Sequence, residues 1–421
     1  MKKVIFVLLL LLNQNLTANQ KVHSIDTNTL LGLLKNNPNI QIIDVRARGD
    51  ILLEGGYIKA NKVTNIPRGK LEFLIKDSVK KDEKFVVHCS TGGSSFLAAK
   101  TLMDMGYKNV LHYKDSYQGW LKDKQPISSL DKALNSILYS DVKKIAKGVY
   151  TSIGATQPGT YENSGHNNNL GFVIGDESVV VWNASSNYLL AKALHVEIKK
   201  ITDKPIKYVV LENSQGHAML GSNYWAEQGV KIISQEIAKE EIINEGEDIY
   251  ERYERVARDK FLGTKLQIPD ETFKDKKTID LGGRIVELLY FGHAHEHSDI
   301  VLWLPKEKIV FAGDIAFNQR MAPILEKTDT LSWLEAWEKF AQLKAKIVVP
   351  GHGDVTDMPT TTKVTKGYIT HLRSKIKELL DKDGELKDSY YVDQSPFEHL
   401  DTFKELAKHN AGRLFEQMEF E

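Results

Sequence analysis

The single cysteine of the chain, Cys89, ends an apolar strand in the segment HCSTGGSSFLAAK. A turn containing Gly92 and Gly93 follows it, and these glycines allow backbone angles that other residues resist. In such a turn successive backbone N–H groups point inward, and the helix that comes next adds its positive end. The pattern therefore predicts a stabilised thiolate at Cys89 and a turn that favours an approaching anion. The alternative is that Cys89 is a small buried hydrophobic residue, which its place at a strand-to-helix turn disfavours.

A second segment, VVLENSQGHAMLGS at 209–222, has the frame of a metal-binding loop. An apolar strand leads into a polar turn with one histidine, and a helix opening with Gly221 follows. Most of the side chains that would hold a metal ion are absent from this turn. Two interpretations therefore remain open, a metalloenzyme with an altered site and a fold that has lost its chemistry.

The elements that must position Cys89 alternate between short β-branched runs and helical stretches over 22–127. QIIDV (41–45), KFVVHCS (84–90) and VLHYKD (110–115) are typical of buried parallel strands, and 94–107 of a helix. This alternation predicts an α/β domain, in which flanking helices cover a parallel sheet. Residues 128–143 carry few landmarks and are interpreted as a linker.

Beyond residue 144 strands come in succession, with helical segments between and after them. The predicted strands are GVYTSI, LGFVIGD, SVVVWN, KYVVLEN, RIVELLYF, DIVLWLP, KIVFAGD and KIVVPGHG. Such runs favour sheets flanked by helices, an α+β domain of four αββα layers spanning 144–421. The tail from about 361 is expected to be helical.

Composition limits the classes of function. Hydrophobic residues make up 42% and charged residues 27%, as in ordinary globular proteins, and the formal net charge of +0 suggests no nucleic-acid partner.

Residues 1–18 are typical of a secretory signal, with Lys2, Lys3 and a nine-residue apolar run too short to span a bilayer. We expect an exported, periplasmic protein without a membrane anchor after cleavage, an uncleaved anchor being the alternative. One cysteine excludes an intramolecular disulfide.

The first half resembles the rhodanese family over nearly the whole domain. The matching segments are IIDVRARGD (42–50), GGYIKANKVTNIP (55–67), CSTGGSS (89–95) and YQGWLKDKQPI (117–127). In that family the cysteine attacks a sulfane sulfur and carries it as a persulfide. The resemblance implies that Cys89 is the nucleophile and that a loop of backbone amides cradles the substrate, namely those of Ser90, Thr91, Gly92, Gly93 and Ser94. Many members carry arginine at the positions of Ser90 and Ser94.

The second half resembles the metallo-β-lactamase superfamily over nearly its full length. The matching segments are 168–186, 209–222, 291–305, 309–315 and 348–355. The first metal motif of the superfamily, His-x-His-x-Asp-His, falls on Glu212, Ser214, Gly216 and His217, so that only the last histidine is kept. The aspartate of the usual Asp-Thr-Gly is Asn183 here.

The resemblance places the later metal ligands at His295, Asp314 and His352. Together with His217, the last two form a two-histidine, one-carboxylate set that suits a catalytic zinc or an iron ion. Glu212, His295 and Asp314 form a weaker second set. We expect one zinc or iron ion, with two ions or none as the alternatives.

The fusion suggests a sulfur-handling protein in which a Cys89 persulfide is coupled to a hydrolase or oxidase of a small sulfur compound. Segments 293–314 and 409–421 are most similar to the branch described as SoxH-like or quinoprotein-relay hydrolases. The expected partners are a small sulfur-containing substrate and a thiol acceptor, with self-association into a homo-oligomer left open. The alternatives are an inactive second domain that serves as a scaffold, and a single-zinc hydrolase of unrelated substrate.

Overall fold

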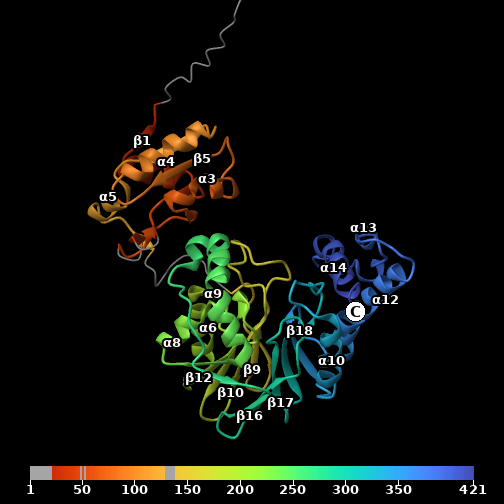
Figure 1. Cartoon of the computed structure of the whole chain (residues 1–421). Coiled ribbons are helices and arrows are strands. Elements are labelled where there is room, and N and C mark those ends of the chain that lie inside the picture. Colours follow the sequence, from red (N-terminus) through yellow and green to blue (C-terminus); the bar gives the residue numbers. More distant parts are fainter. Residues whose placement is uncertain (1–20, 48–49, 52–53, 129–137) are drawn as a thin grey trace, which may run out of the picture. The chain divides into compact units, whose positions relative to one another are not determined.

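A computed structural model describes residues 21–47, 50–51, 54–128 and 138–421 (Figure 1). The chain divides into two compact units, Met1–Ser129 and Leu130–Glu421. The expected signal segment and most of the expected linker lie outside the described residues. Among the described residues, no helix combines the length and apolar character needed to cross a membrane.

The first unit contains a five-stranded sheet in the order β1-β6-β5-β2-β4, and every pair in it is parallel. Its strands are β1 (His23–Ile25), β2 (Gln41–Asp44), β4 (Val63–Asn65), β5 (Lys84–His88) and β6 (Asn109–Tyr113). The interior strand β2 is fully buried, and its Ile42 and Ile43 point to opposite faces, as expected of a parallel sheet covered on both sides. The predicted parallel α/β architecture is confirmed.

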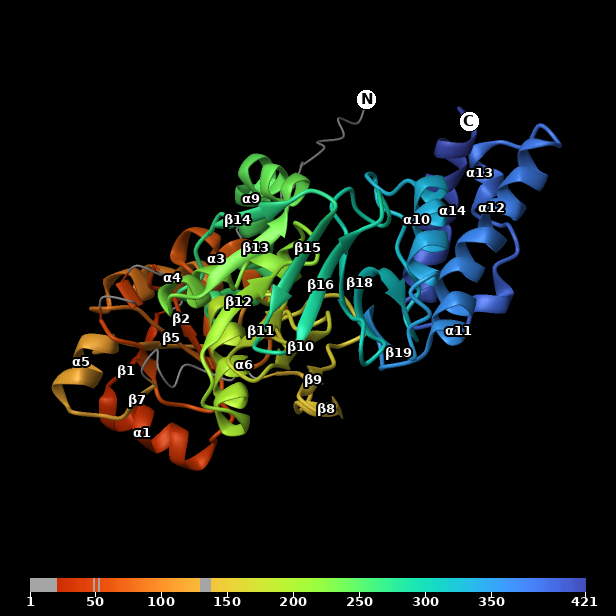
Figure 2. The ribbon, with the colours of Figure 1, turned by 90° about the horizontal axis from the view of Figure 1, so that it is seen from below.

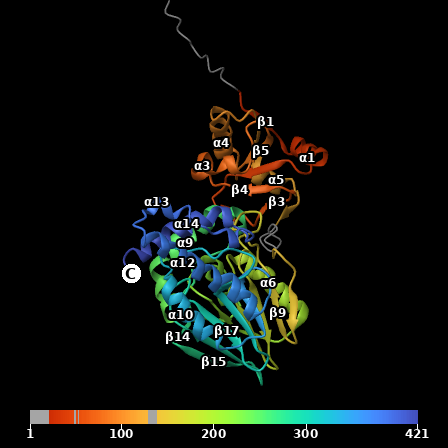
Figure 3. The ribbon, with the colours of Figure 1, turned by 90° about the vertical axis from the view of Figure 1, so that its right-hand side faces the viewer.

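Helices cover both faces of this sheet (Figure 3). Helices α3 (Leu71–Leu74) and α4 (Gly93–Asp104) pack on one face, and α1 (Thr27–Asn36) and α5 (Ser116–Lys122) lie on the other. A short antiparallel pair joins β3 (Tyr57–Ile58) to β7 (Ile127–Ser128). Because β5 ends where α4 begins, this topology holds Cys89 at the carboxyl edge of the sheet.

The second unit contains two sheets. One has seven strands in the order β14-β13-β12-β11-β10-β9-β8, and the other has five in the order β15 to β19. The first sheet comprises β8 (Lys143–Ala146), β9 (Val149–Ser152), β10 (Leu170–Ile174), β11 (Val179–Trp182), β12 (Ile206–Val210), β13 (Lys231–Gln235) and β14 (Glu271–Phe273). The second comprises β15 (Lys276–Asp280), β16 (Ile285–Tyr290), β17 (Ile300–Leu304), β18 (Ile309–Phe317) and β19 (Ile347–His352).

Alternating side chains of these strands build three cores. In β11, Val179 and Val181 pack against helices, while Val180 and Trp182 pack between the two sheets. This division follows from the two-residue period of a strand. The outer layers are α6 (Tyr188–Ile201), α8 (Ser222–Glu227) and α9 (Glu236–Ala257) on one side and α10 (Thr330–Ala341), α12 (Gly367–Leu380) and α14 (Phe403–Met418) on the other (Figure 2). The four-layer αββα fold is confirmed, as is the helical tail.

Four strands of this unit were not predicted, namely β8, β13, β14 and β15. Three of them are edge strands, in which most residues are exposed or half-buried, so their sequences lack the apolar runs that mark the central strands. Short elements complete the unit: α7 (Gly216–Met219), α11 (Met358–Thr361) and α13 (Leu386–Ser389).

Candidate functional site

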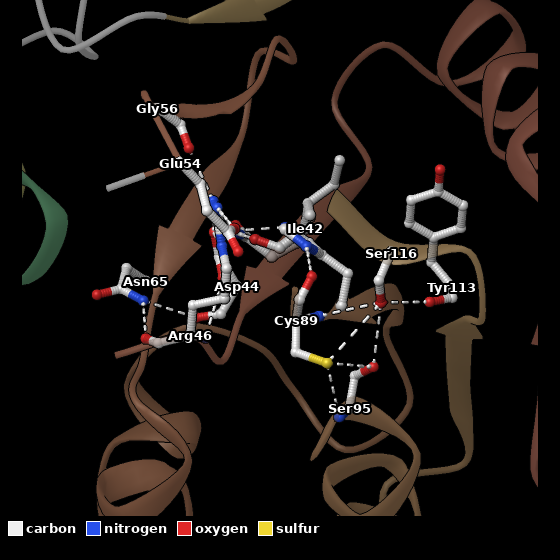
Figure 4. A network of polar contacts seen from close by, with 12 residues as sticks. Ile42, Asp44, Arg46, Glu54, Gly56, Asn65, Cys89, Ser95, Tyr113 and Ser116 are labelled. Carbon is white, nitrogen blue, oxygen red and sulfur yellow. Dashed lines mark hydrogen bonds and ion pairs between the residues drawn. The ribbon is translucent and has the colours of Figure 1, made fainter. Parts of the chain in front are cut away.

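Cys89 directly follows β5, in the turn before α4, and its sulfur faces hydrogen-bond donors (Figure 4). The amide of Gly92 lies 3.1 Å from Sγ, the amide of Ser95 3.4 Å and the Ser95 hydroxyl 3.3 Å. The Ser116 hydroxyl lies 3.9 Å from Sγ and accepts from the Cys89 amide at 3.2 Å. The sulfur is therefore held in a polar cradle, although the residue is only 5% exposed.

This cradle changes the acidity of the thiol. Burial opposes ionisation, but the Ser95 hydroxyl and the amides of Ser95 and Gly92 together lower the pKa of Cys89 below its ordinary value. Gly92 has φ +101°, and a side chain there would run into the carbonyl oxygen of Lys114. Only glycine therefore fits at the position from which the shortest amide contact is made.

The predicted loop residues are divided between the cradle and a cavity. Ser90, Thr91 and Ser94 line a cavity of about 310 Å³ together with Cys89, while Gly92 donates to the sulfur and Gly93 begins α4. Two arginines that sequence reasoning did not assign to the site, Arg46 and Arg68, also line this cavity; the other lining residues are Val45, Ala47, Asp50, Pro67 and Gly69.

Arg46 stabilises the fold beside the Cys89 loop (Figure 4). Its buried guanidinium contacts Asp44 at 2.6 Å and Glu54 at 2.7 Å, and it donates to the carbonyl of Gly56 at 2.8 Å. Glu54 also accepts from Gln118 at 3.0 Å. Asp44 and Arg46, a buried pair with all its partners in place, therefore hold the fold in position rather than take part in chemistry. Arg68 is a third exposed and donates to Glu72 and Thr101.

In the second unit, His217, Asp314 and His352 come together from α7, β18 and β19. One ligand atom from each lies within 4.8 Å of the others, and all three residues are buried. His217 Nε2 is 3.5 Å and His352 Nε2 3.2 Å from the Asp314 carboxylate. Neighbouring ligand atoms around a tetrahedral zinc with bonds of about 2 Å lie about 3.3 Å apart, so these separations suit one bound ion.

Unpartnered polar atoms support the same conclusion. Both carboxylate oxygens of Asp314, both ring nitrogens of His295 and Oε2 of Glu212 are buried without a hydrogen-bond partner. Buried polar groups without partners are rare because each costs about 1–3 kcal/mol. A cation among these groups removes that cost, and the donor set therefore fits a metal ion.

His352 has the tautomer and the charge that a metal ligand needs. His352 Nδ1 lies 2.5 Å from the carbonyl of Asn167, and donating there leaves Nε2 free to face Asp314. Arg320 Nη1 also lies 2.9 Å from this Nδ1, but the shorter contact to a carbonyl, which can only accept, fixes the proton. Burial, helped by Arg320, lowers the pKa of His352 to about 4, so its imidazole is neutral at pH 7, as a metal ligand must be.

The second predicted set is less complete. His295 Nδ1 lies 3.6 Å from Asp314, outside the three-residue cluster. Glu212 Oε1 lies 2.9 Å from His217 Nε2, the same nitrogen that faces Asp314, so Glu212 either accepts this hydrogen bond or joins an ion as a further oxygen ligand. Burial, and then the nearby Asp314 charge, raise the pKa of Glu212.

His293 and His297 lie with their ring centroids 4.2 Å apart, but both face other groups. His293 donates to the carbonyl of Lys327, and His297 lies 3.2 Å from the Glu241 carboxylate.

Comparisons with known proteins match each unit to a family. Residues 27–123 match the rhodanese-like domain, and residues 220–352 match the metallo-beta-lactamase superfamily. The chain joins a rhodanese-like domain to a metallo-β-lactamase-superfamily domain. The second match begins just after the altered loop at 212–217 and includes Asp314 and His352.

The rhodanese-like domain has two similar curated relatives. It is 33% identical over 97 residues to a rhodanese domain-containing protein of Drosophila melanogaster, covering 20% of this chain and 85% of that one. It is 26% identical over 106 residues to a sulfurtransferase of Allochromatium vinosum, covering 25% and 94% respectively. These relatives support sulfur transfer as the activity of this domain.

The lactamase-fold domain is 33% identical over 93 residues to the type 2 metallo-beta-lactamase of Bacteroides fragilis. The match covers 21% of this chain and only 37% of that enzyme. A solved metallo-beta-lactamase from Pontibacter korlensis is 22% identical with a TM-score of 0.44, covering 53% of this chain and 95% of that one.

A cavity of about 580 Å³ opens over the metal set of the lactamase-fold domain and is lined by His217, His295, Asp314 and His352. Sequence reasoning missed several of its other lining residues, among them Asn167, Tyr253 and Arg320. Likewise it missed Ser95 and Ser116 in the rhodanese-like domain. The role of Ser95 could have been predicted from the sequence. It lies in the first turn of the predicted helix, where backbone amides point toward groups that precede the helix.

Proposed function

We propose that this protein is an exported sulfur-handling enzyme that carries sulfane sulfur on Cys89 and processes a small sulfur compound at a single-metal centre in its lactamase-fold domain. The observation that carries the proposal is the sulfur of Cys89, which meets three donors within 3.4 Å on the wall of a cavity. A thiolate with a lowered pKa in a cavity is a nucleophile ready for attack.

The sulfur-transfer step needs no oxidant or reductant. The Cys89 thiolate attacks the outer sulfur of a sulfane donor, a new S–S bond forms, and the S–S bond of the donor breaks. The donor remnant leaves with the electron pair of that bond. The resulting persulfide anion extends from Sγ into the cavity lined by Ser90, Thr91 and Ser94. A thiolate acceptor then attacks the outer sulfur and releases the Cys89 thiolate.

His217, Asp314 and His352 would hold the ion of the second centre. A bound zinc or iron ion supplies a Lewis acid in a cavity large enough for a small molecule. Asn167 keeps the proton of His352 on Nδ1, and Asp314 balances the charge of the ion. Hydrolysis is the favoured reaction because water is its only co-reactant, whereas an oxidase would also need dioxygen.

The second centre is proposed to act on a sulfur compound because it shares one chain with the rhodanese-like domain. Export is a separate inference, which rests on residues 1–18. The lost carboxylate at Gly216 argues against turnover of β-lactams at the rate of intact enzymes. The similarity of segments 293–314 and 409–421 to SoxH-like proteins supports this part of the proposal.

The sulfur-carrier role is tested by mass spectrometry of the intact protein after incubation with thiosulfate or a glutathione persulfide. The expected result is one adduct of about 32 Da, the mass of one sulfur atom. The adduct should be absent from Cys89→Ser and present in Ser94→Ala, a matched change in an exposed neighbour. Wild-type protein that stays unloaded with every donor would remove the carrier role.

The metal centre is tested by elemental analysis of the protein purified from its native compartment. We expect one equivalent of zinc or iron, lost in His217→Ala and His352→Ala and kept in His293→Ala. A folded wild-type protein without metal would instead support an inactive second domain that serves as a scaffold.

A further inference from the structure

One stripe of α9 faces the altered metal loop. Glu245, Ile249, Tyr253 and Ala257 follow one another at intervals of four residues, and all of them line the cavity over the metal set. Residues four apart share one face of a helix. A single helix therefore provides one wall of the candidate centre, although its residues lie well beyond the loop in the sequence.

Tyr253 occupies the space beside Gly216. A Cβ atom added at Gly216 would lie 2.8 Å from both Cδ2 and Cζ of the Tyr253 ring, and closer still to Cε2. The backbone of Gly216 is not in the left-handed region, so its conformation would accept any L residue. The Tyr253 ring, rather than the backbone, is what keeps this position free of a side chain.

The neighbouring position that lacks a ligand is also covered by α9. Glu241 accepts hydrogen bonds at 2.8 Å from Ser214 and at 2.8 Å from Ser298. The Ser214 hydroxyl is therefore engaged with the helix instead of facing Asp314. Both non-ligand positions of the loop, 214 and 216, are thus in contact with residues of α9.

We propose that Tyr253 is a specificity-determining residue of the metal centre: its ring fills the space that a carboxylate at position 216 would need, and so limits the ligands of the centre to His217, Asp314 and His352. The inference rests on the metal centre of the proposed function. It adds a cause for the altered loop, namely that the missing side chain of Gly216 in the loop matches the ring of Tyr253 on the helix.

The test is a double-mutant cycle on the full chain with Zn²⁺ and Co²⁺ alone as probes. The variants are Gly216→Asp, Tyr253→Ala and the two combined, with Gly216→Asp/Tyr250→Ala as the matched control. Tyr250 is on the same helix, and its hydroxyl donates to the carbonyl of Thr264. Competition with a chelator gives the affinity, elemental analysis the stoichiometry, and thermal melting reports folding.

The combined variant should bind Zn²⁺ at least about tenfold more tightly than wild type, because it gains an oxygen ligand in the space that the ring has left. Gly216→Asp alone should gain no affinity and should melt at a lower temperature, since the new side chain meets the ring. Tyr253→Ala alone adds no ligand and serves as the reference for the combined variant, and the Tyr250 control should behave as Gly216→Asp alone.

Two results would overturn the inference: equal tightening by Gly216→Asp alone, or a folded combined variant that binds no more tightly than wild type. If wild type binds no ion while the combined variant binds one, the pairing of Gly216 with Tyr253 is supported and the metal function of the natural chain is lost. If wild type binds one ion and the combined variant is unchanged, the metal function stands and the role of Tyr253 falls.

Discussion

The two strand-to-helix loops of this protein differ in what their sites are made of. At Cys89 two of the three donors within 3.4 Å of the sulfur are backbone amides, those of Gly92 and Ser95. At 212–217 the candidate metal ligands are side-chain atoms, and only His217 of that loop joins Asp314 and His352 in the metal cluster.

This difference makes the two loops unequally sensitive to side-chain substitution. Serines at 90 and 94 replace the arginines of many rhodaneses, yet the amides that hold the sulfur are independent of side-chain identity. A metal centre loses one ligand with each side chain that changes, and Ser214 and Gly216 supply none. A site built from backbone tolerates sequence change better than a site built from side chains.

The largest effect is expected on metal affinity at the second site, whose ligands are all side chains. Asp314→Ala should weaken Zn²⁺ binding by at least about 10²-fold, because structural zinc sites share about 10–16 kcal/mol among four ligands. His293→Ala, whose ring bonds to the Lys327 carbonyl, should bind as wild type does. Chelator competition measures both, and unchanged affinity in Asp314→Ala would place the ion elsewhere.

The single side-chain donor of the sulfur cradle should give the next largest effect. Ser95→Ala removes the hydroxyl that lies 3.3 Å from Sγ but keeps the amide. The Cys89 pKa should rise by about one unit, and sulfur loading at pH 7 should slow by about tenfold. The pH dependence of Cys89 alkylation reports the pKa. No rise in this variant would make the hydroxyl irrelevant to the thiolate.

The wild-type pH profile should show the combined effect of the Ser95 hydroxyl and the backbone amides on the thiol. Because the pKa of Cys89 is lowered in the folded protein, its alkylation rate should reach half its maximum at a lower pH than the alkylation rate of the unfolded chain. The same shift stabilises the fold fully above the unfolded pKa, and this stabilisation is lost as pH falls through the folded pKa. Urea unfolding at several pH values, compared with Cys89→Ser, measures it. A midpoint at or above that of a free cysteine would refute the cradle.

The smallest effect is expected at Ser94, which lines the cavity and is exposed. Ser94→Ala should change the acid dissociation constant of Cys89 and the rate of sulfur loading each by less than about twofold. The reason is that the hydrogen bonds to Sγ among the described residues come from other groups. A large loss in this variant would mean that side chains matter in the first loop as they do in the second, and the contrast between the loops would disappear.

Much of the fold could be predicted from local sequence. The runs at 41–45 and 84–90 are mostly apolar, which marks buried parallel strands, and the continuous apolar run in 178–183 marks a strand between two layers. The edge strands β8, β14 and β15 carry no such signal because one or both of their faces meet solvent. Sequence patterns report burial, and these strands are scarcely buried.

For the sites, the sequence by itself determined the chemical types and the strand ends that carry them: a thiol before a glycine turn, and two histidines and a carboxylate at ends of neighbouring elements. Only the tertiary structure decided which groups meet. Tyr253 and Glu241 come from a helix after the loop, Ser116 from the start of α5, and Asn167 from a segment before β10. Contacts between residues distant in the chain depend on how layers pack, and no local pattern encodes that packing.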